Sequence, residues 1–360
     1  MIGNRWLQGA AAGVGAAAAA VTAGLVVERR VVRTRQAVGQ AADELGSLRG
    51  DARTVRTDDG VELFAEIDEV APYGGAPRAS SADPTIVFVH GYALNLDCWH
   101  FQRAYFRGKH RMVFYDQRSH GRSGRSDQEH ASIDQLGDDL RRIIEELVPC
   151  GPVVLVGHSM GGMSVLAFAE RHPEVFAARV AGVALVATTA GGLKTDNVLS
   201  RFVPSAVGAR VAPRVVAGLA LAPRLVDGVR RRGSNLGFLV AGEFAFGEDV
   251  PASYVEFVNN MLAATPFEVL AQFFPHFHTL DKFTALDQVG RVPTTIVIGS
   301  KDVMTSIGHS RKMAARMPSA ALVEVPGGGH MVILEKKDRV NAALDQLFAA
   351  ADASPTARVS

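Results

Sequence analysis

A serine between two glycines stands where a predicted strand gives way to a predicted helix. The run GHSMG at residues 157–161 follows the apolar stretch Val153–Val156 and opens a helical stretch that extends to His172. Glycines here permit a tight turn in which a Cβ would collide with neighbouring backbone. The amino terminus of the helix would direct its free N–H groups and the positive end of its dipole at Ser159. A serine hydroxyl in such a position can act as a nucleophile once a base removes its proton.

Extended by one residue, the run reads GHSMGG and resembles the nucleophile segment of the α/β-hydrolase superfamily. The resemblance covers residues ~52–350, and this form of the motif is common among esterases, lipases and related serine hydrolases. It implies an α/β-hydrolase fold, with a mostly parallel central sheet, helices on both faces and a helical lid insertion. In this family the nucleophile is followed by an acid after a late strand and by a histidine near the end of the chain.

Two later loops supply residues that match the acid and the histidine. Asp302 ends the run GSKD after the stretch Thr294–Ile298, and His330 ends the run GGGH after Leu322–Val325. The resemblance implies that Ser159 is the nucleophile and His330 its general base. Asp302 would then hold the imidazole in the correct tautomer and stabilise the imidazolium that forms.

Other histidines and acids are present but lack this placement. Some hydrolases carry the acid after an earlier strand, here Val180–Ala187, where this chain has Thr188 and Thr189 instead. Asp281 and Asp287 precede the late strand, whereas Asp302 follows it. The alternative histidines, none of which follows a strand through a glycine-rich loop, are His276, His278 and His309.

The loop after the stretch Thr85–Val89 begins His90-Gly91-Tyr92. In the resembling family this loop gives one backbone N–H to the oxyanion hole, which implies the N–H of Tyr92. The residue after the nucleophile, Met160, would give the second. Two such donors stabilise a tetrahedral oxyanion, and loss of one donor raises the activation free energy by about 3–4 kcal/mol. We expect His90 to be a structural residue of the loop.

The run DQRSHGRS at residues 116–123 is similar to the D-x-R-G-x-G-x-S turn of the same family. Ser119 stands where glycine is usual, and a positive φ at that position would strain it. We expect a structural turn, in which Asp116 and Arg118 pin the loop by paired hydrogen bonds, in preference to a substrate contact.

Strands and helices alternate along the body of the chain, which indicates a parallel sheet covered on both faces. A hairpin is predicted around Asp58-Asp59-Gly60. A helix is predicted from an apolar stripe between Ile133 and Leu147, and another near Val340–Ala349. The predicted strands are Thr54–Arg56, Glu62–Ile67, Thr85–Val89, Arg111–Tyr115, Val153–Val156, Val180–Ala187, Thr294–Ile298 and Leu322–Val325.

The predicted organisation divides the hydrolase core into two parts around an insertion. Residues 1–50 form an apolar segment and a charged linker, 51–190 and 291–350 form the core, and 351–360 form a flexible tail. Residues 191–290 contain several prolines and short amphipathic runs, which favours a helical lid over the carboxyl edge of the sheet. The expected walls of an apolar substrate pocket, taken from the second half of this insertion, are Phe257, Leu262, Phe267, Leu270, Phe273 and Phe274.

The amino-terminal segment Leu7–Val27 contains no charged residue and is long enough to span a bilayer as a helix. Arginines follow it closely, at 29, 30, 33 and 35, and this asymmetry favours an anchor with the body on the cytoplasmic side. One alternative is an export signal, either cleaved after Ala23 or uncleaved, and the other is a plain alanine-rich helix. Arginines of the lid are also predicted to face an anionic membrane; the alternative is that they form a solvated face of the lid. These arginines are Arg201, Arg210, Arg214, Arg224, Arg230, Arg231 and Arg232.

The composition is that of a globular protein without a nucleic-acid-binding field. Among 360 residues, 38 are basic and 37 acidic, and 48% are hydrophobic, which allows a sizeable core. The two cysteines, Cys98 and Cys150, exclude a disulfide scaffold and a cysteine-based zinc site. Neither a metal cluster nor a phosphate-binding loop stands out, so we expect no cofactor.

Together these features predict a serine hydrolase that cleaves small-molecule or lipid carboxylic esters, with apolar acyl groups, through an acyl-enzyme. Thioesterases, carbon–carbon bond hydrolases and perhydrolase-like haloperoxidases share the motifs and stay open. Epoxide hydrolases and haloalkane dehalogenases use an aspartate nucleophile, which Ser159 does not match. A ligand-binding protein that keeps the triad without catalysis is the alternative from another class.

Overall fold

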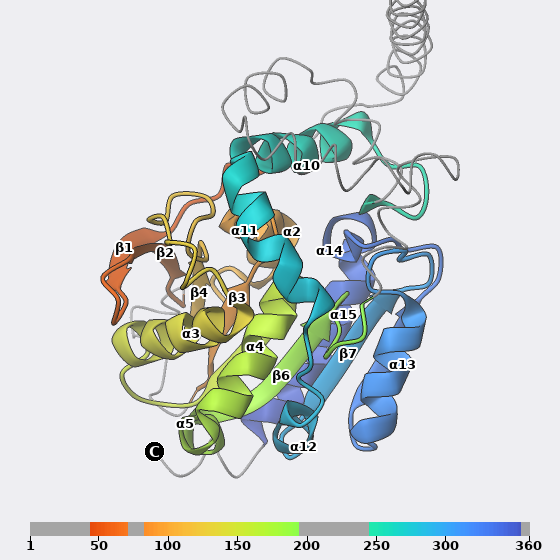
Figure 1. The fold of residues 1–360 in the computed structure, drawn as a ribbon. Helices are drawn as coiled ribbons and strands as arrows, with labels where there is room; N and C mark the ends of the chain where they lie inside the picture. Colours follow the sequence, from red (N-terminus) through yellow and green to blue (C-terminus); the bar gives the residue numbers. More distant parts are fainter. Residues whose placement is uncertain (1–43, 71–82, 194–244, 354–360) are drawn as a thin grey trace, which may run out of the picture.

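The computed structural model describes residues 44–70, 83–193 and 245–353. Within them, eight strands form one sheet in the order β1-β2-β4-β3-β5-β6-β7-β8 (Figure 1). Their bounds are β1 Asp51–Arg56, β2 Glu62–Asp68, β3 Thr85–Val89, β4 Met112–Tyr115, β5 Val153–His158, β6 Val180–Val186, β7 Thr294–Gly299 and β8 Ala321–Val325.

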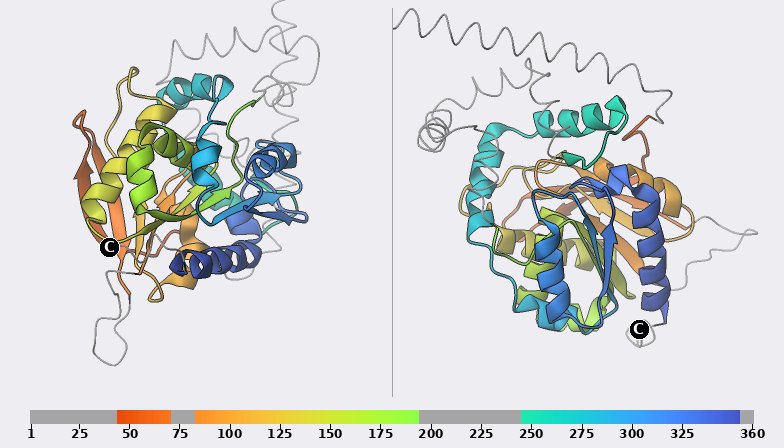
Figure 2. Two further views of the ribbon diagram at one scale, coloured as in Figure 1. Left: turned by 90° about the horizontal axis from the view of Figure 1, so that it is seen from below. Right: turned by 90° about the vertical axis from the view of Figure 1, so that its right-hand side faces the viewer.

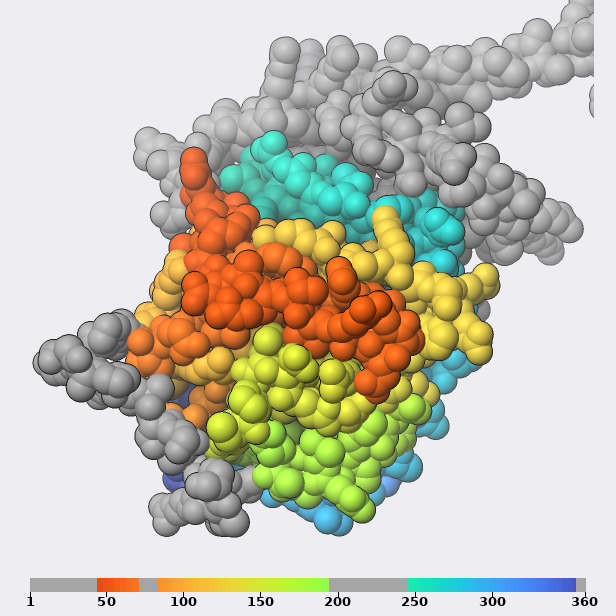
Figure 3. Space-filling model, turned by 90° about the vertical axis from the view of Figure 1, so that its left-hand side faces the viewer, coloured from red at the N-terminus to blue at the C-terminus, as the bar shows by residue number. Residues whose placement is uncertain are grey.

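The six strands from β3 to β8 pair in parallel, and β2 joins them antiparallel to β4. Continuous β-branched and apolar runs such as Thr85–Val89 are fully buried, as expected for strands covered on both faces. The antiparallel hairpin of β1 and β2 closes one edge, where β1 exposes most of its residues (Figure 3). The mostly parallel sheet predicted for an α/β-hydrolase fold is confirmed.

Alternate residues of the strands supply two separate apolar clusters, one on each face of the sheet. Phe88 and Val156 face α2 (His100–Phe106), α14 (Val332–Glu335) and α15 (Lys337–Asp352). Val87 and Leu155 face the helices on the opposite side (Figure 2). These opposite helices are α3 (Ile133–Leu147), α4 (Met160–Arg171), α5 (Pro173–Arg179), α12 (Ala285–Val289) and α13 (Ile307–Arg316).

Helix α3 shows how the sequence specifies a helix in this layer. The side chain of Ser132 accepts a hydrogen bond from the backbone N–H of Gln135, which caps the amino terminus. Its apolar residues recur every three or four positions and all point into the core. The stripe predicted from the sequence is buried in full, and it comprises Ile133, Leu136, Leu140, Ile143, Ile144 and Leu147.

Helices α10 (Ala252–Ala264) and α11 (Phe267–His278) belong to the insertion between β6 and β7 and lie over the carboxyl edge of the sheet (Figure 1). Pro251 and Pro266 directly precede them, where a missing N–H costs no helical hydrogen bond. The arginines predicted to face a membrane lie outside the described residues, as does the apolar segment Leu7–Val27. Within the described residues, no helix is both long and apolar enough to cross a membrane.

Residues 44–50 are attached to the body of the protein ahead of β1. The side chain of Leu45 packs against the core cluster that contains α2, and the N–H of Gly46 donates to Nδ1 of His100 at 3.2 Å. Arg103 donates to the carbonyl of Leu48 at 3.2 Å. A truncation intended to preserve the body must therefore leave this segment in place.

The 116–123 turn is pinned by Asp116 and Arg118, each through partners of its own. Asp116 accepts hydrogen bonds from the backbone N–H groups of Leu96 and Arg122, both at 2.8 Å. Ser119 adopts φ 66°, the strained conformation expected if serine replaces the usual glycine there. Its Oγ accepts from the N–H of Ser126 at 2.8 Å, which holds the turn closed.

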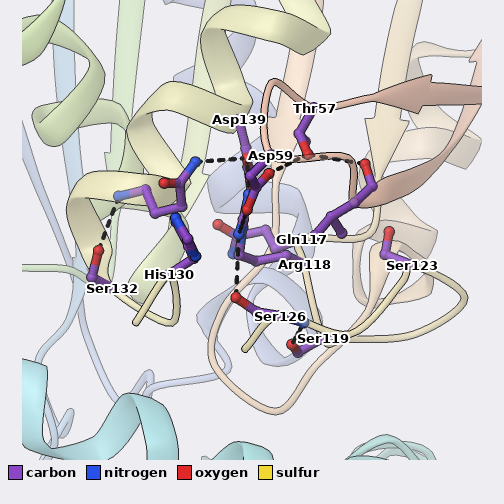
Figure 4. A network of polar contacts seen from close by, with 12 residues as sticks. Thr57, Asp59, Gln117, Arg118, Ser119, Ser123, Ser126, His130, Ser132 and Asp139 are labelled. Carbon is purple, nitrogen blue, oxygen red and sulfur yellow. Dashed lines mark hydrogen bonds and ion pairs between the residues drawn. The ribbon is translucent and has the colours of Figure 1, made fainter. Parts of the chain in front are cut away.

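Arg118 is fully buried and forms paired hydrogen bonds with two carboxylates (Figure 4). Two of its nitrogens reach the oxygens of Asp139 at 2.6 Å each, and two reach Asp59 at 2.8 and 3.0 Å. The side chain thereby joins the turn to α3 and to the β1–β2 hairpin. Since the guanidinium of Arg118 links the turn, α3 and the hairpin to one another, we assign Arg118 a structural role.

Replacing Arg118 by methionine is expected to lower the free energy of unfolding by about 3–5 kcal/mol, because Asp139 is then left buried without its cation. Urea unfolding of the purified protein measures the change. Arg142→Met is the matched control, because Arg142 forms its ion pairs at a more exposed position. There the expected loss is below about 1 kcal/mol. Equal losses in the two variants would contradict the structural role of Arg118.

Candidate active site

Ser159 lies in the tight turn between β5 and α4, with φ 52° and ψ −119°. A positive φ in a non-glycine residue costs roughly 1–3 kcal/mol and persists only where neighbours enforce it. A Cβ on Gly157 would lie 2.6 Å from the carbonyl oxygen of Gly161, and one on Gly161 would lie 2.1 Å from that of Val89. Both flanking glycines are therefore required, as the sequence predicted for such a turn.

The structure brings Ser159, His330 and Asp302 together in one hydrogen-bonded line. Nε2 of His330 lies 3.0 Å from Oγ of Ser159, and Nδ1 lies 2.9 Å from Oδ2 of Asp302. A carboxylate oxygen can only accept, so the imidazole proton belongs on Nδ1 and leaves Nε2 free to accept from the serine hydroxyl. All three residues are buried, with at most 8% of the surface of any of them exposed.

Asp302 is held as a carboxylate by four donors. Its Oδ1 accepts from the N–H groups of Met304 and Thr305 at 2.7 and 2.9 Å, and its Oδ2 accepts from Oγ1 of Thr305 at 2.7 Å and from His330. Burial alone would raise the pKa of Asp302, but His330 and the bonds from Thr305 outweigh it and lower that pKa to about 2. Thr305 was not predicted from the sequence, because the usual turn signal of an aspartate is a bond to the backbone two residues on, which requires no particular side chain at position 305.

The rival residues either bond to other partners or belong to α11. Nδ1 of His309 lies 3.1 Å from Oγ1 of Thr189 and 3.2 Å from the carbonyl of Gly191. Asp287 pairs with Arg316 at the surface. His276 and His278 belong to α11, and Asp281 accepts from the N–H of Phe283 beyond its end.

The loop that carries His330 packs backbone against backbone. A Cβ on Gly299, at the end of β7, would lie 2.2 Å from the carbonyl oxygen of Gly328. A Cβ on Gly329 would lie 2.3 Å from the nitrogen of Gly247, and one on Gly247 would lie 2.3 Å from the oxygen of Gly327. No side chain fits at these contacts, so the glycine run before His330 is set by close approach of three chain segments.

His90 orients the peptide that carries the N–H of Tyr92. The N–H of Gln117 donates to Nε2 of His90 at 2.9 Å, so the ring proton is on Nδ1, which donates to the carbonyl of Gly91 at 2.8 Å. That carbonyl shares a rigid peptide plane with the N–H of Tyr92. Burial lowers the pKa of His90 to about 4, which keeps the ring neutral in this role.

This loop also touches the nucleophile. A Cβ built on Gly91 would lie 3.1 Å from Cβ of Ser159 and 2.9 Å from Nδ1 of His158. His158 donates from Nε2 to the carbonyl of His330 at 3.0 Å, and burial lowers the pKa of His158 to about 3. No role was predicted for His158 from the sequence, but in the structure its side chain supports the backbone of His330.

The insertion is bonded to the same loop. The hydroxyl of Tyr92 donates to the carbonyl of Leu270 in α11, and Oγ1 of Thr265 donates to the carbonyl of Ala93 at 3.2 Å. Thr265 lies between α10 and α11, so the junction of the two helices is fixed to the residues that follow His90.

The six predicted wall residues do not form one group. Phe273 and Phe274 join a cluster with Met160 and Tyr92, next to the nucleophile turn, although Phe273 is fully buried. Phe257 and Leu262 pack instead against the cluster that contains Trp99 and Phe101. Leu270 and Phe267 are partly buried in α11. A substrate-facing role for the set stays a prediction.

Within the described residues, no group of three or more histidine, cysteine, aspartate or glutamate side chains is arranged to hold a metal ion.

Comparisons with known proteins place the chain in a family by its sequence and fold. The model of the alpha/beta hydrolase family matches residues 86–343. An sn-1-specific diacylglycerol lipase of Mus musculus is 26% identical over 259 residues, which cover 70% of this chain and 77% of the lipase. A 3-oxoadipate enol-lactonase of Acinetobacter baylyi is 25% identical over 279 residues, covering 77% of this chain and 91% of that protein.

Among solved structures, a thermophilic esterase from Thermogutta terrifontis superimposes with a TM-score of 0.63 at 22% identity, covering 84% of this chain and 99% of the esterase. This likeness concerns the fold. The family match spans more than half of the chain and includes Ser159, Asp302 and His330, the three residues of the hydrogen-bonded line. The chain therefore belongs to the alpha/beta hydrolase family.

Proposed function

We propose that the protein is a serine hydrolase that cleaves carboxylic esters with apolar acyl groups through an acyl-enzyme intermediate. The observation that carries this proposal is the line from Ser159 through His330 to Asp302, with distances of 3.0 and 2.9 Å. A serine bonded to a base that is itself oriented by a third group is the arrangement that nucleophilic catalysis requires. The lipase and lactonase relatives support an ester as the substrate.

In the proposed acylation, Oγ of Ser159 attacks the ester carbonyl carbon while its proton passes to Nε2 of His330. The carbonyl oxygen becomes an oxyanion, which the N–H groups of Tyr92 and Met160 would stabilise. When the tetrahedral intermediate collapses, His330 returns the proton to the departing alkoxide, and the acyl group stays on Ser159. A water molecule then attacks the acyl-enzyme by the reverse sequence, which releases the acid and restores the serine.

The preference for apolar acyl groups is proposed from the clusters around the nucleophile. Phe273, Phe274 and Met160 pack together beside the turn, and α10 and α11 would act as a lid above it. If the acyl chain is buried there, each methylene contributes about 0.8 kcal/mol, or roughly fourfold in kcat/KM.

The proposal is tested with a fluorophosphonate probe and p-nitrophenyl esters from acetate to decanoate. We expect the probe to label the wild type at Ser159, and kcat/KM to rise from acetate toward the medium chains. A protein that is not labelled and hydrolyses no ester would be a ligand-binding protein. Labelling with a strong preference for thioesters or for a carbon–carbon bond substrate would move the activity to another branch of the family.

For the location we propose that Leu7–Val27 tethers a cytoplasm-facing body to the membrane, on the basis of the apolar run and the arginines that follow it. Full-length protein is expected in the membrane fraction at low and high salt. A chain lacking residues 1–43, which keeps the attached segment 44–50, is expected to leave that fraction, or to retain only binding that high salt removes, and to hydrolyse soluble esters. Soluble full-length protein, or cleavage after Ala23 with export, would contradict the anchor.

A further inference from the structure

The end of β6 binds Ser159 at both of its backbone groups. The N–H of Ser159 donates to the carbonyl of Val186 at 2.9 Å, and Oγ1 of Thr188 donates to the carbonyl of Ser159 at 2.6 Å. The same carbonyl accepts from the N–H groups of Gly162 and Met163 in the first turn of α4, at 3.0 and 3.3 Å. Thr188 is thus the nearest donor to this oxygen, and it is 1% exposed.

The carbonyl of Ser159 and the N–H of Met160 belong to one peptide unit. Because that unit is planar and trans, its C=O and N–H point in opposite directions, and fixing one fixes the other. Met160 is the first residue of α4, where a backbone N–H has no acceptor within the helix. A hydrogen bond to the carbonyl also polarises the peptide and strengthens its N–H as a donor.

We propose that Thr188 is a positioning residue for catalysis, whose hydroxyl clamps the Ser159–Met160 peptide so that the N–H of Met160 is directed at the oxyanion. This inference rests on the proposed function. It gives the second oxyanion peptide a counterpart to the bond by which His90 holds the carbonyl of Gly91. The N–H groups of Tyr92 and Met160 would then each be oriented by a hydrogen bond to the carbonyl of the same peptide unit, that of Gly91 and that of Ser159 respectively.

The surroundings of Thr188 fit a clamp. Ser159 has a positive φ, and a strained residue of this kind needs contacts that hold it in place. A Cβ on Gly162 would lie 2.6 Å from Oγ1 of Thr188 and 2.5 Å from its Cγ2. The threonine can approach the first turn of α4 only because residue 162 is glycine, which accounts for the sixth position of GHSMGG.

The neighbouring threonine provides a matched control. Oγ1 of Thr189 donates to the carbonyl of Gly191 at 2.9 Å and accepts from the N–H of the same residue at 3.0 Å. Thr189 is also fully buried at the end of β6, but its bonds lead away from the nucleophile turn. Loss of its hydroxyl therefore reproduces the local loss of stability without touching the Ser159–Met160 peptide.

The test compares the wild type with Thr188→Ser, Thr188→Ala and Thr189→Ala. The two substitutions at 188 both lack the methyl group and differ only in the hydroxyl. The measurements are kcat per active site, with sites counted by fluorophosphonate titration, KM for p-nitrophenyl butyrate, and the inhibition constant of an alkyl trifluoromethyl ketone. This ketone adds to the serine and forms an oxyanion, so it reports the oxyanion contacts directly.

We expect Thr188→Ser and Thr189→Ala to stay within about twofold of the wild type in all three measurements. Thr188→Ala is expected to lower kcat about tenfold with KM within twofold, since misdirecting one donor costs less than the 10²–10³-fold that its complete removal costs. Its inhibition constant for the ketone is expected to rise by a similar factor.

Equal losses in Thr188→Ser and Thr188→Ala would assign the effect to the methyl group and overturn the clamp. So would a Thr188→Ala protein with fewer active sites or a lower Tm but an unchanged kcat per site. If the wild type itself neither reacts with the fluorophosphonate nor hydrolyses the ester, the proposed function fails and the clamp fails with it. An active wild type with an equally active Thr188→Ala overturns the clamp alone.

Discussion

Replacing Ser159 by alanine is expected to lower kcat for ester hydrolysis by about 10⁶-fold, the loss that removal of a triad nucleophile causes in a well-studied serine hydrolase. Without Oγ no acyl-enzyme can form, and His330 has no hydroxyl proton to accept. Alanine is smaller than serine, so the turn and the fold should be preserved. The measurement is steady-state hydrolysis of p-nitrophenyl butyrate, together with labelling by a fluorophosphonate, which the variant should not show.

Ser310→Ala is the control for removing a buried serine. Ser310 is fully buried in α13, and its Oγ has no hydrogen-bond partner in the described part of the chain. We expect wild-type kcat and full labelling from this variant. Near-normal hydrolysis by Ser159→Ala would instead place the nucleophile elsewhere.

Asp302→Asn is expected to lower kcat on the order of 10⁴-fold while the protein stays folded. The N–H groups of Met304 and Thr305 both donate to Oδ1, so the amide oxygen of asparagine must take that position. The amide nitrogen then faces Nδ1 of His330 as a donor. This forces the imidazole proton onto Nε2, which can no longer accept the proton of Ser159.

The pH-independent kcat of the variant measures this effect, and Asp287→Asn is the control. Asp287 precedes β7 in the sequence, whereas Asp302 follows it, and Asp287 pairs with Arg316 at the surface. We expect no change in kcat from the control. A loss of only a few-fold in Asp302→Asn would mean that another carboxylate orients His330.

Much of the fold was accessible from the sequence because its signals are local. The strand Thr85–Val89 was predicted to the residue, since a run of β-branched and apolar residues bounded by turns has few other uses. The stripe of α3 was equally informative. The antiparallel pairing of β2 with β4 was not predicted, because the order of strands depends on contacts between residues far apart in the chain.

The site divides in the same way. Ser159, Asp302 and His330 each follow a strand, and the structure brings the three together. The partners that hold them were not readable, because Thr188 binds a carbonyl 29 positions earlier and His158 binds one 172 positions later. The periodicity of α10 and α11 showed which residues are apolar, but it could not decide which cluster each would join, and so Phe257 and Phe273 were placed in one set.

The glycine contacts beneath His330 bear on how specificity could be exchanged between relatives by recombination. Gly247 touches Gly327 and Gly329, and Ala245, two residues earlier, accepts a hydrogen bond from the N–H of Met331 at 2.7 Å. Residues 245–247 therefore belong structurally to the loop that carries His330, although in the sequence they lie inside the insertion. In a chimera that takes α10 and α11 from a relative, the crossover should therefore lie after Gly247. The relative then supplies the two helices, and this protein keeps residues 245–247, which contact its own His330 loop.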